Sequence, residues 1–274
     1  MSVTFFGVPK VSINDVVDGT IALIGSKIAT ESMHKPYGVG SAARVLRKVS
    51  CEYTGYIPAL NIDIHEKDVV DLGDYDESSI GSAVRGVLKR GGIAIVIGGD
   101  HATTYYALKD SGVKSILWLD AHLDISEEEK VSHASALRHL IRNSNGRIRT
   151  IVIGFRGYST PRMEINYAKK LGLEIIPYPF PQEYLKKALE KADAISLDMD
   201  FFDAVFFKAT RVPEILGMSL SEFIIRLRSV SKLNAVYFDF VEYCPEIDLG
   251  YTHGKILAQL ILEVISAFIK SGYG

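Results

Sequence analysis

The sequence is poor in cysteine and nearly balanced in charge. Its 274 residues include two cysteines, Cys51 and Cys244, which lie far apart and form no CxxC motif. Two isolated thiols exclude a disulfide framework and fit a reducing cytoplasm. The formal net charge of -2 lacks the strong basic bias that nucleic-acid and membrane-surface partners favour, so we expect neither partner.

Segments that would target, anchor or divide the chain are also missing. The N-terminal residues have no basic segment followed by a long apolar one, so no signal peptide is expected. The most apolar late stretch, 256–269, is interrupted by Gln259 and Glu263 and is predicted to be too short and too polar to span a bilayer. Because no linker, repeat or low-complexity stretch is present, we expect one domain over residues 1–274.

The sequence does contain a regular alternation of apolar runs and helical patterns, and 47% of its residues are hydrophobic. We predict strands at 20–25, 61–64, 93–97, 115–119, 150–154, 173–176, 194–197 and 234–238. We predict helices at 41–49, 77–90, through 105–108, and at 132–143, 161–171, 181–191, 219–229 and 252–270, with loops at 71–76 and 201–218. The central runs are continuous, which predicts an α/β fold: a three-layer α/β/α sandwich with a mostly parallel sheet of about eight strands.

Three of the predicted strands end in polar clusters. The strand 93–97 is followed by Gly-Gly-Asp-His, the strand 115–119 by Asp-Ala-His-Leu-Asp, and the strand 194–197 by Asp-Met-Asp and a further aspartate. Open parallel sheets place their functional sites beyond the carboxyl ends of the strands, so we expect these clusters to converge. The candidate site residues are His101, Asp120, His122, Asp124, Asp198, Asp200 and Asp203.

So many carboxylates in one place would repel each other unless cations shared them. Oxygen donors mixed with imidazole, and no thiolate, favour Mn²⁺, with Fe²⁺, Co²⁺ or Zn²⁺ as alternatives, over Ca²⁺ or Mg²⁺. The candidate groups are too many for one ion, and bridging carboxylates would allow two metals to share a water in a hydrolytic site.

Each cluster alone has a simpler interpretation. An isolated Asp-x-His is more often a turn, a Gly-Gly-Asp-His can be a phosphate loop, and an Asp-x-Asp can bind a single Mg²⁺. Their combination at one sheet edge favours the metal site. A nucleotide site is the weaker alternative because the sequence has neither GxGxxG nor GxxxxGK[ST].

Taken together, these motifs resemble the ureohydrolases, the family of arginase, agmatinase, formimidoylglutamase and guanidino-acid hydrolases. The resemblance covers nearly the whole chain in order. It is carried by Gly98–His101, Asp120–Asp124, Ser132-His133, Ser196–Asp203 and Glu242, together with Pro36–Gly40 followed by Arg44 and Arg47.

The resemblance implies an arginase/deacetylase-like fold and two manganese ions per subunit. One metal would be held by His101, Asp120, Asp124 and Asp198, and the other by Asp120, His122, Asp198 and Asp200. It implies that Asp203 supports the loop or a ligand rather than binding metal directly, that His133 is the catalytic proton shuttle, and that Glu242 binds the substrate guanidinium. It also implies a homo-oligomer, a trimer or a hexamer. Without the resemblance, His133 would be a helix-start residue and Glu242 an ordinary loop residue.

The sequence departs from the family pattern in the loop 201–218. The family commonly has proline after the position of Asp203 and a Gly-Gly pair later, whereas this chain has Ala204 and Leu216-Gly217-Met218. These departures concern the shape of the substrate pocket and leave the metal ligands untouched, all of which are present.

The segment between Asp124 and His133 is short, with three glutamates and no asparagine. It suits a dicationic substrate better than an amino-acid carboxylate, and it resembles compact microbial agmatinases. We therefore predict a cytoplasmic hydrolase that converts agmatine to putrescine and urea, a step of polyamine biosynthesis. Arginine or another guanidino or formimidoyl compound is the alternative substrate. The motifs also leave open a metal-binding relative without catalysis and a one-zinc deacetylase of related fold.

Overall fold

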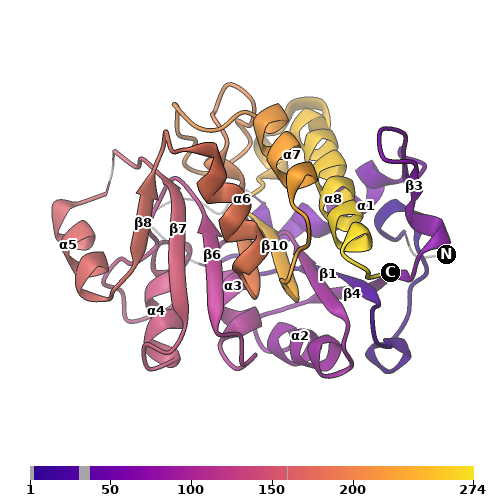
Figure 1. Cartoon of the computed structure of the whole chain (residues 1–274), viewed down its shortest axis with the longest axis horizontal. Helices are drawn as coiled ribbons and strands as arrows, with labels where there is room; N and C mark the ends of the chain where they lie inside the picture. The colour runs from indigo at the N-terminus through magenta and orange to yellow at the C-terminus, as the bar shows by residue number, and fades with distance from the viewer. Residues whose placement is uncertain (1–2, 31–37, 159) are drawn as a thin grey trace.

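The computed structural model describes residues 3–30, 38–158 and 160–274, and its centre is an eight-stranded sheet. All neighbouring strands in it are parallel, in the order β4-β1-β5-β10-β9-β6-β7-β8 (Figure 1). The strands are β1 (Ile21–Ser26), β4 (Val69–Tyr75), β5 (Ile93–Ile97), β6 (Ser115–Leu119), β7 (Arg149–Phe155), β8 (Glu174–Pro177), β9 (Ala194–Asp198) and β10 (Tyr237–Val241). A separate antiparallel pair is formed by β2 (Tyr56–Ile57) and β3 (Ile62–Asp63).

Helices cover both faces of the sheet. They are α1 (Ala42–Ser50), α2 (Ile80–Lys89), α3 (Ala102–Leu108), α4 (Ala136–Asn143), α5 (Arg162–Lys170), α6 (Gln182–Lys191), α7 (Leu220–Ser229) and α8 (Thr252–Lys270). One hydrophobic cluster packs α1, α6, α7 and α8 against the sheet, and another packs α2 to α5 against the opposite face (Figure 1). Successive residues of β5 enter the two clusters alternately, because side chains of a strand point to opposite faces. The predicted three-layer α/β/α sandwich is confirmed.

The order of the strands creates the site. The neighbours β5, β10, β9 and β6 occupy the middle of the sheet. Two of the polar clusters predicted from the sequence follow β5 and β6 directly, and the third begins at Asp198, the last residue of β9. Because the strands are parallel, the clusters meet at the carboxyl edge, and Glu242 joins them from the end of β10.

The strand β10 begins three residues later than predicted. The prediction was 234–238, whereas β10 is Tyr237–Val241. Tyr237 pairs with Ala94 on one side and Ala194 on the other, so the neighbouring strands set where the pairing starts. Apolar content alone could not set this register.

The predicted acidic loop at 71–76 is wrong, because residues 71–75 belong to the strand β4. Asp71 is fully buried and pairs with Arg47 of α1, whose Nε and Nη2 lie 2.7 and 3.0 Å from its carboxylate oxygens. Arg47 also pairs with Asp74 and lies over the ring of Phe5, 4.1 Å from its centre. A charged residue can occupy a strand here because its partner is supplied by another element.

The segment Leu249–Lys270, which contains α8, could span a membrane by length and composition alone, contrary to the prediction that 256–269 is too short and too polar. Within the structure, 67% of its apolar window is buried. Its side chains pack with α1 and α7, as those of a core helix do.

The buried pair of Arg47 and Asp71 gives a test of this fold. Arg47→Ala leaves the fully buried Asp71 carboxylate without its cation, and we expect it to lower the free energy of unfolding by about 3–5 kcal/mol. Denaturant unfolding measures the change. The control is Arg44→Ala, an exposed arginine of the same helix, for which a change below about 0.5 kcal/mol is expected. Equal effects of the two substitutions on the free energy of unfolding would contradict the stabilising role of the buried Arg47–Asp71 pair.

Candidate metal centre

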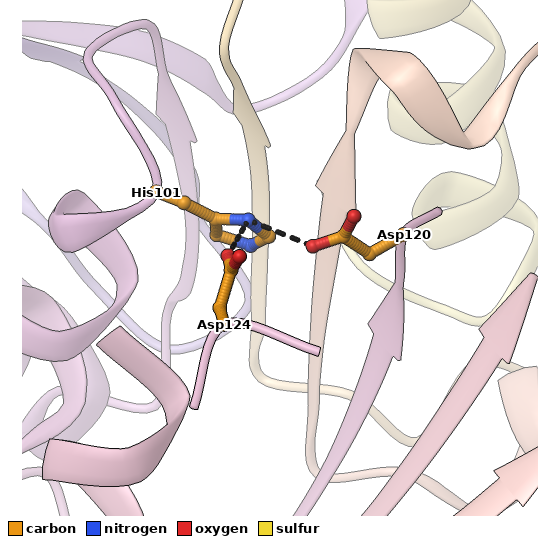
Figure 2. Close-up of side chains that lie close together, drawn as sticks. All are labelled: His101, Asp120 and Asp124. Carbon is orange, nitrogen blue, oxygen red and sulfur yellow. Dashed lines mark ion pairs between the residues drawn. The ribbon is translucent and has the colours of Figure 1, made fainter. Parts of the chain in front are cut away.

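The first group of predicted ligands surrounds His101. Its Nδ1 atom lies 3.2 Å from Asp120 Oδ2, 2.9 Å from Asp124 Oδ2 and 3.1 Å from Asp198 Oδ2. Figure 2 shows the imidazole facing the carboxylates of Asp120 and Asp124. His101 is fully buried, so these contacts are shielded from water.

The second group surrounds His122. Its Nδ1 atom lies 3.5 Å from Asp120 Oδ1 and 3.1 Å from Asp200 Oδ2. Asp120 therefore turns one oxygen to each histidine and joins the two groups. Asp198 accepts the backbone N–H of Asp200 through Oδ1 at 2.8 Å and faces His101 through Oδ2.

The local backbone is shaped for these contacts. Gly98 and Gly99 have φ of +90° and +81°, and a Cβ on Gly99 would lie 2.3 Å from Thr103 Oγ1. Glycine is thus required in the turn that leads from β5 to His101. Asp124 also has a left-handed backbone, with φ of +49°, which aspartate tolerates better than most residues.

Hydrogen bonds behind His101 fix its tautomer. Ser196 donates to Asp239 Oδ1 at 2.7 Å, so its hydroxyl proton is already committed. Thr104 likewise donates to Asp239 Oδ2 at 2.7 Å. The contact of 2.9 Å between His101 Nε2 and Ser196 Oγ must therefore have the imidazole as donor. The neutral ring then presents the lone pair of Nδ1 to three carboxylates, which is stable only with a proton or a cation between them.

The chain's single tryptophan supports the same ligands. The ring of Trp118 stacks on His101, with centroids 3.9 Å apart and planes 9° apart. Its indole Nε1 donates to Asp120 Oδ2 at 2.9 Å. The ring of a predicted ligand, His101, and the carboxylate shared by the two groups are thus both held by one buried side chain.

The shifted pKa values of the cluster indicate that positive charge stabilises it. Burial raises the pKa of Asp124 to about 7, and the charge of Asp120 adds to this shift. Burial also raises the pKa of Asp200 to about 6, and it raises that of Asp198 well above its usual value. For His101, burial favours the neutral ring, but the three surrounding carboxylates outweigh it and raise the pKa well above its usual value.

The donor set fits divalent cations. Each group combines one imidazole nitrogen with carboxylate oxygens, and no thiol takes part. The nitrogen–oxygen separations around His101, 2.9 to 3.2 Å, are those expected for neighbouring ligands of one small ion, which binds at roughly 2.0–2.2 Å. The sharing of Asp120 fits two adjacent ions.

A cavity of about 390 Å³ opens beside the cluster. His133, in a short 3-10 helix (His133–Ser135), is half-buried and lines it, and its role as proton shuttle stays a prediction. Glu128 and Glu164 also line it, and Ser126 donates to Glu164 Oε1 at 2.9 Å.

Glu242 lines the same cavity, but its carboxylate is engaged by a residue that the sequence did not indicate. Arg211 donates from Nε to Oε2 at 2.8 Å and from Nη2 to Oε1 at 2.6 Å. Oε1 also accepts the backbone N–H of His101 at 2.8 Å. The charge of Arg211 overcomes burial and lowers the pKa of Glu242, so Glu242 is an anion.

Asp203 lies in the loop 201–218 and is absent from both metal groups of the described residues. Its Oδ1 accepts the backbone N–H of Val205 at 2.8 Å, and its Oδ2 accepts that of Gly217 at 3.1 Å. These bonds connect the beginning and the end of the loop. The early motif at Pro36–Tyr37, by contrast, lies outside the described residues.

Sequence reasoning missed several residues that contact the site. They are Trp118, Arg211, Asp239 and Glu214, whose Oε1 lies 3.4 Å from His122 Nε2, and Ser196 belonged to a quoted motif but was given no role. Asp239 could have been noticed, because it is an aspartate within the apolar run Val236–Val241. Arg211 and Glu214 gave no such signal, since both lie in an irregular loop.

Comparisons with known proteins agree with this geometry. A model of the arginase family matches residues 19–267. The human mitochondrial guanidino acid hydrolase is 27% identical over 278 residues, covering 91% of this chain and 78% of its own length. The agmatinase of Pyrococcus horikoshii is 27% identical over 269 residues, covering 92% and 93%. The structure of proclavaminate amidino hydrolase from Streptomyces clavuligerus has a TM-score of 0.83 at 21% identity, covering 99% of this chain and 98% of that one.

The link from His101 through Ser196 to Asp239 can be tested by metal binding. Asp239→Asn weakens the acceptor that orients Ser196, and hence the imidazole, so we expect Mn²⁺ affinity to fall by about 10–100-fold. Calorimetric titration of metal-free protein measures it. Tyr237→Phe is the control, because it removes another hydrogen bond to Asp239 but leaves Ser196 in place. Unchanged affinity in a folded Asp239→Asn variant would contradict the link.

The raised pKa values of Asp124 and Asp200 give a pH test. Because their pKa values are higher in the folded than in the unfolded state, their contribution to stability is lost as pH rises through about 6 and about 7. The metal-free protein should therefore melt at a lower temperature at about pH 8 than at about pH 5. Saturating Mn²⁺ should remove this difference in melting temperature between the two pH values, and Asp124→Asn should make the difference smaller. A melting temperature that rises with pH in the metal-free protein would disprove the argument.

Proposed function

The chain belongs to the arginase family of hydrolases, which act on guanidino and amidino C–N bonds, and we propose that its substrate is agmatine, cleaved to putrescine and urea. The single observation that carries the choice of agmatine is the acidic lining of the cavity by Glu128 and Glu164. Four of the six predicted metal ligands are buried and two, His122 and Asp124, are half-buried, whereas Glu128 is exposed, so the lining runs from the cluster towards solvent. A primary ammonium at the outer end of the substrate would meet carboxylates there.

The residues of the chain divide the reaction between them. Two divalent cations, proposed to be manganese, would supply a water acidic enough to be a nucleophile at neutral pH. Glu242 would hold a planar guanidinium through a bidentate contact. His133 would carry the proton that the departing amine needs. The burial of His101, Asp120, Asp198 and Asp200 keeps these predicted ligands out of contact with bulk water.

Other substrates in the family suit this cavity less well. Relatives include the guanidinobutyrase of Pseudomonas aeruginosa, 23% identical over 260 residues, and the mitochondrial guanidino acid hydrolases. By their names these proteins act on compounds with a carboxyl group. In this chain such a group would meet Glu128 and Glu164, which repel it. Measured turnover would separate agmatinase activity from a metal-binding relative without catalysis and from a deacetylase.

We further propose that the protein acts in the cytoplasm, in polyamine biosynthesis, as a homo-oligomer of three or six copies. The low cysteine content and the resemblance to agmatinases support this. Neither a nucleic acid nor a membrane is proposed as a partner.

The function is tested by urea release from Mn²⁺-loaded protein. Agmatine, arginine, guanidinobutyrate and formimidoylglutamate are run side by side, with ammonia or formamide assayed for the last. We expect urea from agmatine and none from arginine, with Asp120→Asn as the inactive blank. A preference for arginine or guanidinobutyrate would reject agmatine as the substrate. If protein with two bound metals releases no product from any of the four compounds, a relative without catalysis is favoured.

The role of the acidic lining is tested separately. Glu164→Gln removes a charged contact to the substrate ammonium, so kcat/KM for agmatine should fall about tenfold. Butylguanidine, which has no ammonium group, should be hydrolysed equally by both proteins. Glu129→Gln is the control, since this exposed glutamate is in the same segment as Glu128 but does not line the cavity. An equal loss with both substrates would show that Glu164 does not recognise the ammonium.

A further inference from the structure

The carboxylate proposed to bind the substrate's guanidinium already holds a guanidinium. Arg211 meets Glu242 through two parallel hydrogen bonds, from Nε at 2.8 Å and from Nη2 at 2.6 Å. This is the fork geometry that guanidinium groups make with carboxylates, and a guanidino substrate would use the same two oxygens. The side chains of both residues are buried, with exposures of 1% and 6%.

The backbone on both sides keeps the two residues in register. Glu242 has φ of +68°, an uncommon value for glutamate, and its N–H donates to Gly99 O at 2.9 Å. The loop carrying Arg211 is attached alongside, because Cys244 N–H donates to Ala209 O at 2.8 Å. The pair is thus placed by main-chain hydrogen bonds on both chain segments.

Glu242 has no oxygen left for a second bidentate partner. Oε2 accepts from Arg211 Nε, and Oε1 accepts from Arg211 Nη2 and from the backbone of His101. The arginine makes a second, longer ion pair, with its Nη2 3.8 Å from Asp100 Oδ2, but one of its nitrogens is not engaged by any residue that the structure describes. Its Nη1 makes no hydrogen bond with any residue in the described part of the chain, and its side chain lines the cavity.

We infer that Arg211 is a specificity-determining residue that occupies the guanidinium subsite of its own active site. This rests on the proposed function, which assigns Glu242 to the substrate. A guanidino substrate can pair with Glu242 only after it displaces Arg211. One ion pair is then exchanged for another, so the substrate binds more weakly than it would to a carboxylate without a partner. Arg211 does not compete with compounds that bind in the site without contacting Glu242.

The subsite can be probed without turnover by thermal unfolding with guanidinium chloride at millimolar concentration. Arg211→Ala leaves a hole of guanidinium shape beside an anionic Glu242, so the free ion should bind and raise the melting temperature. Urea, which is planar but neutral, and sodium chloride should not. Wild type should not be stabilised. Arg138→Ala, which removes another buried arginine that does not contact Glu242, should lose stability without recovery by guanidinium.

Kinetics supply the second readout. In Arg211→Ala, KM for agmatine should fall about tenfold or more while kcat is retained, because the internal competitor is gone. A residue that merely braces the loop would instead lower kcat and raise KM. Arg211→Lys keeps the charge but loses the bidentate contact. If Arg211→Ala does not fold, the lysine variant should still be stabilised by guanidinium and show a smaller fall in KM.

The outcomes separate this inference from the proposed function. Stabilisation by guanidinium without hydrolysis of agmatine by any variant would support the occupied subsite and reject agmatinase activity. Hydrolysis of agmatine with an unchanged or higher KM in the variants, and no stabilisation by guanidinium, would retain the function and overturn the inference.

Discussion

The sharing of Asp120 between two histidines is the interaction on which the site depends. One oxygen faces His101 and the other faces His122, so the two groups of ligands cannot separate. The cost of gathering these buried carboxylates is visible in the raised pKa values of Asp124, Asp198 and Asp200. Cations lower this cost, which makes the stability of the folded chain and the occupancy of the site one linked property.

The sequence predicted the parts of the site that strands deliver. His101, Asp120 and Asp198 each follow an apolar run, and the convergence of parallel strands at one edge follows from general rules of sheet architecture. What could not be predicted depends on contacts across the chain. Asp71 appeared to be a loop residue because its partner, Arg47, is 24 positions away. Arg211 is 31 positions from Glu242 and lies in a loop without periodicity.

Two residues of the site, Asp124 and Glu242, have left-handed backbone conformations. Such conformations cost of order 1–3 kcal/mol for residues other than glycine. In this protein they occur where a carboxylate must be turned towards the cluster or the cavity, and main-chain contacts such as the bond from Glu242 to Gly99 O hold them. The fold therefore maintains strain in the segments that do the recognition, while the strands behind them are regular.

The strand β10 is the last strand of the chain, yet it lies between β5 and β9 in the middle of the sheet. During synthesis, the half of the sheet that ends in β5 and the half that ends in β9 cannot be joined until β10 has been made, since β5 and β9 are not neighbours. The same strand brings Asp239 behind His101 and leads into Glu242. Assembly of the active site thus coincides with closure of the sheet, and a nascent chain that has not yet released β10 from the ribosome holds an incomplete centre.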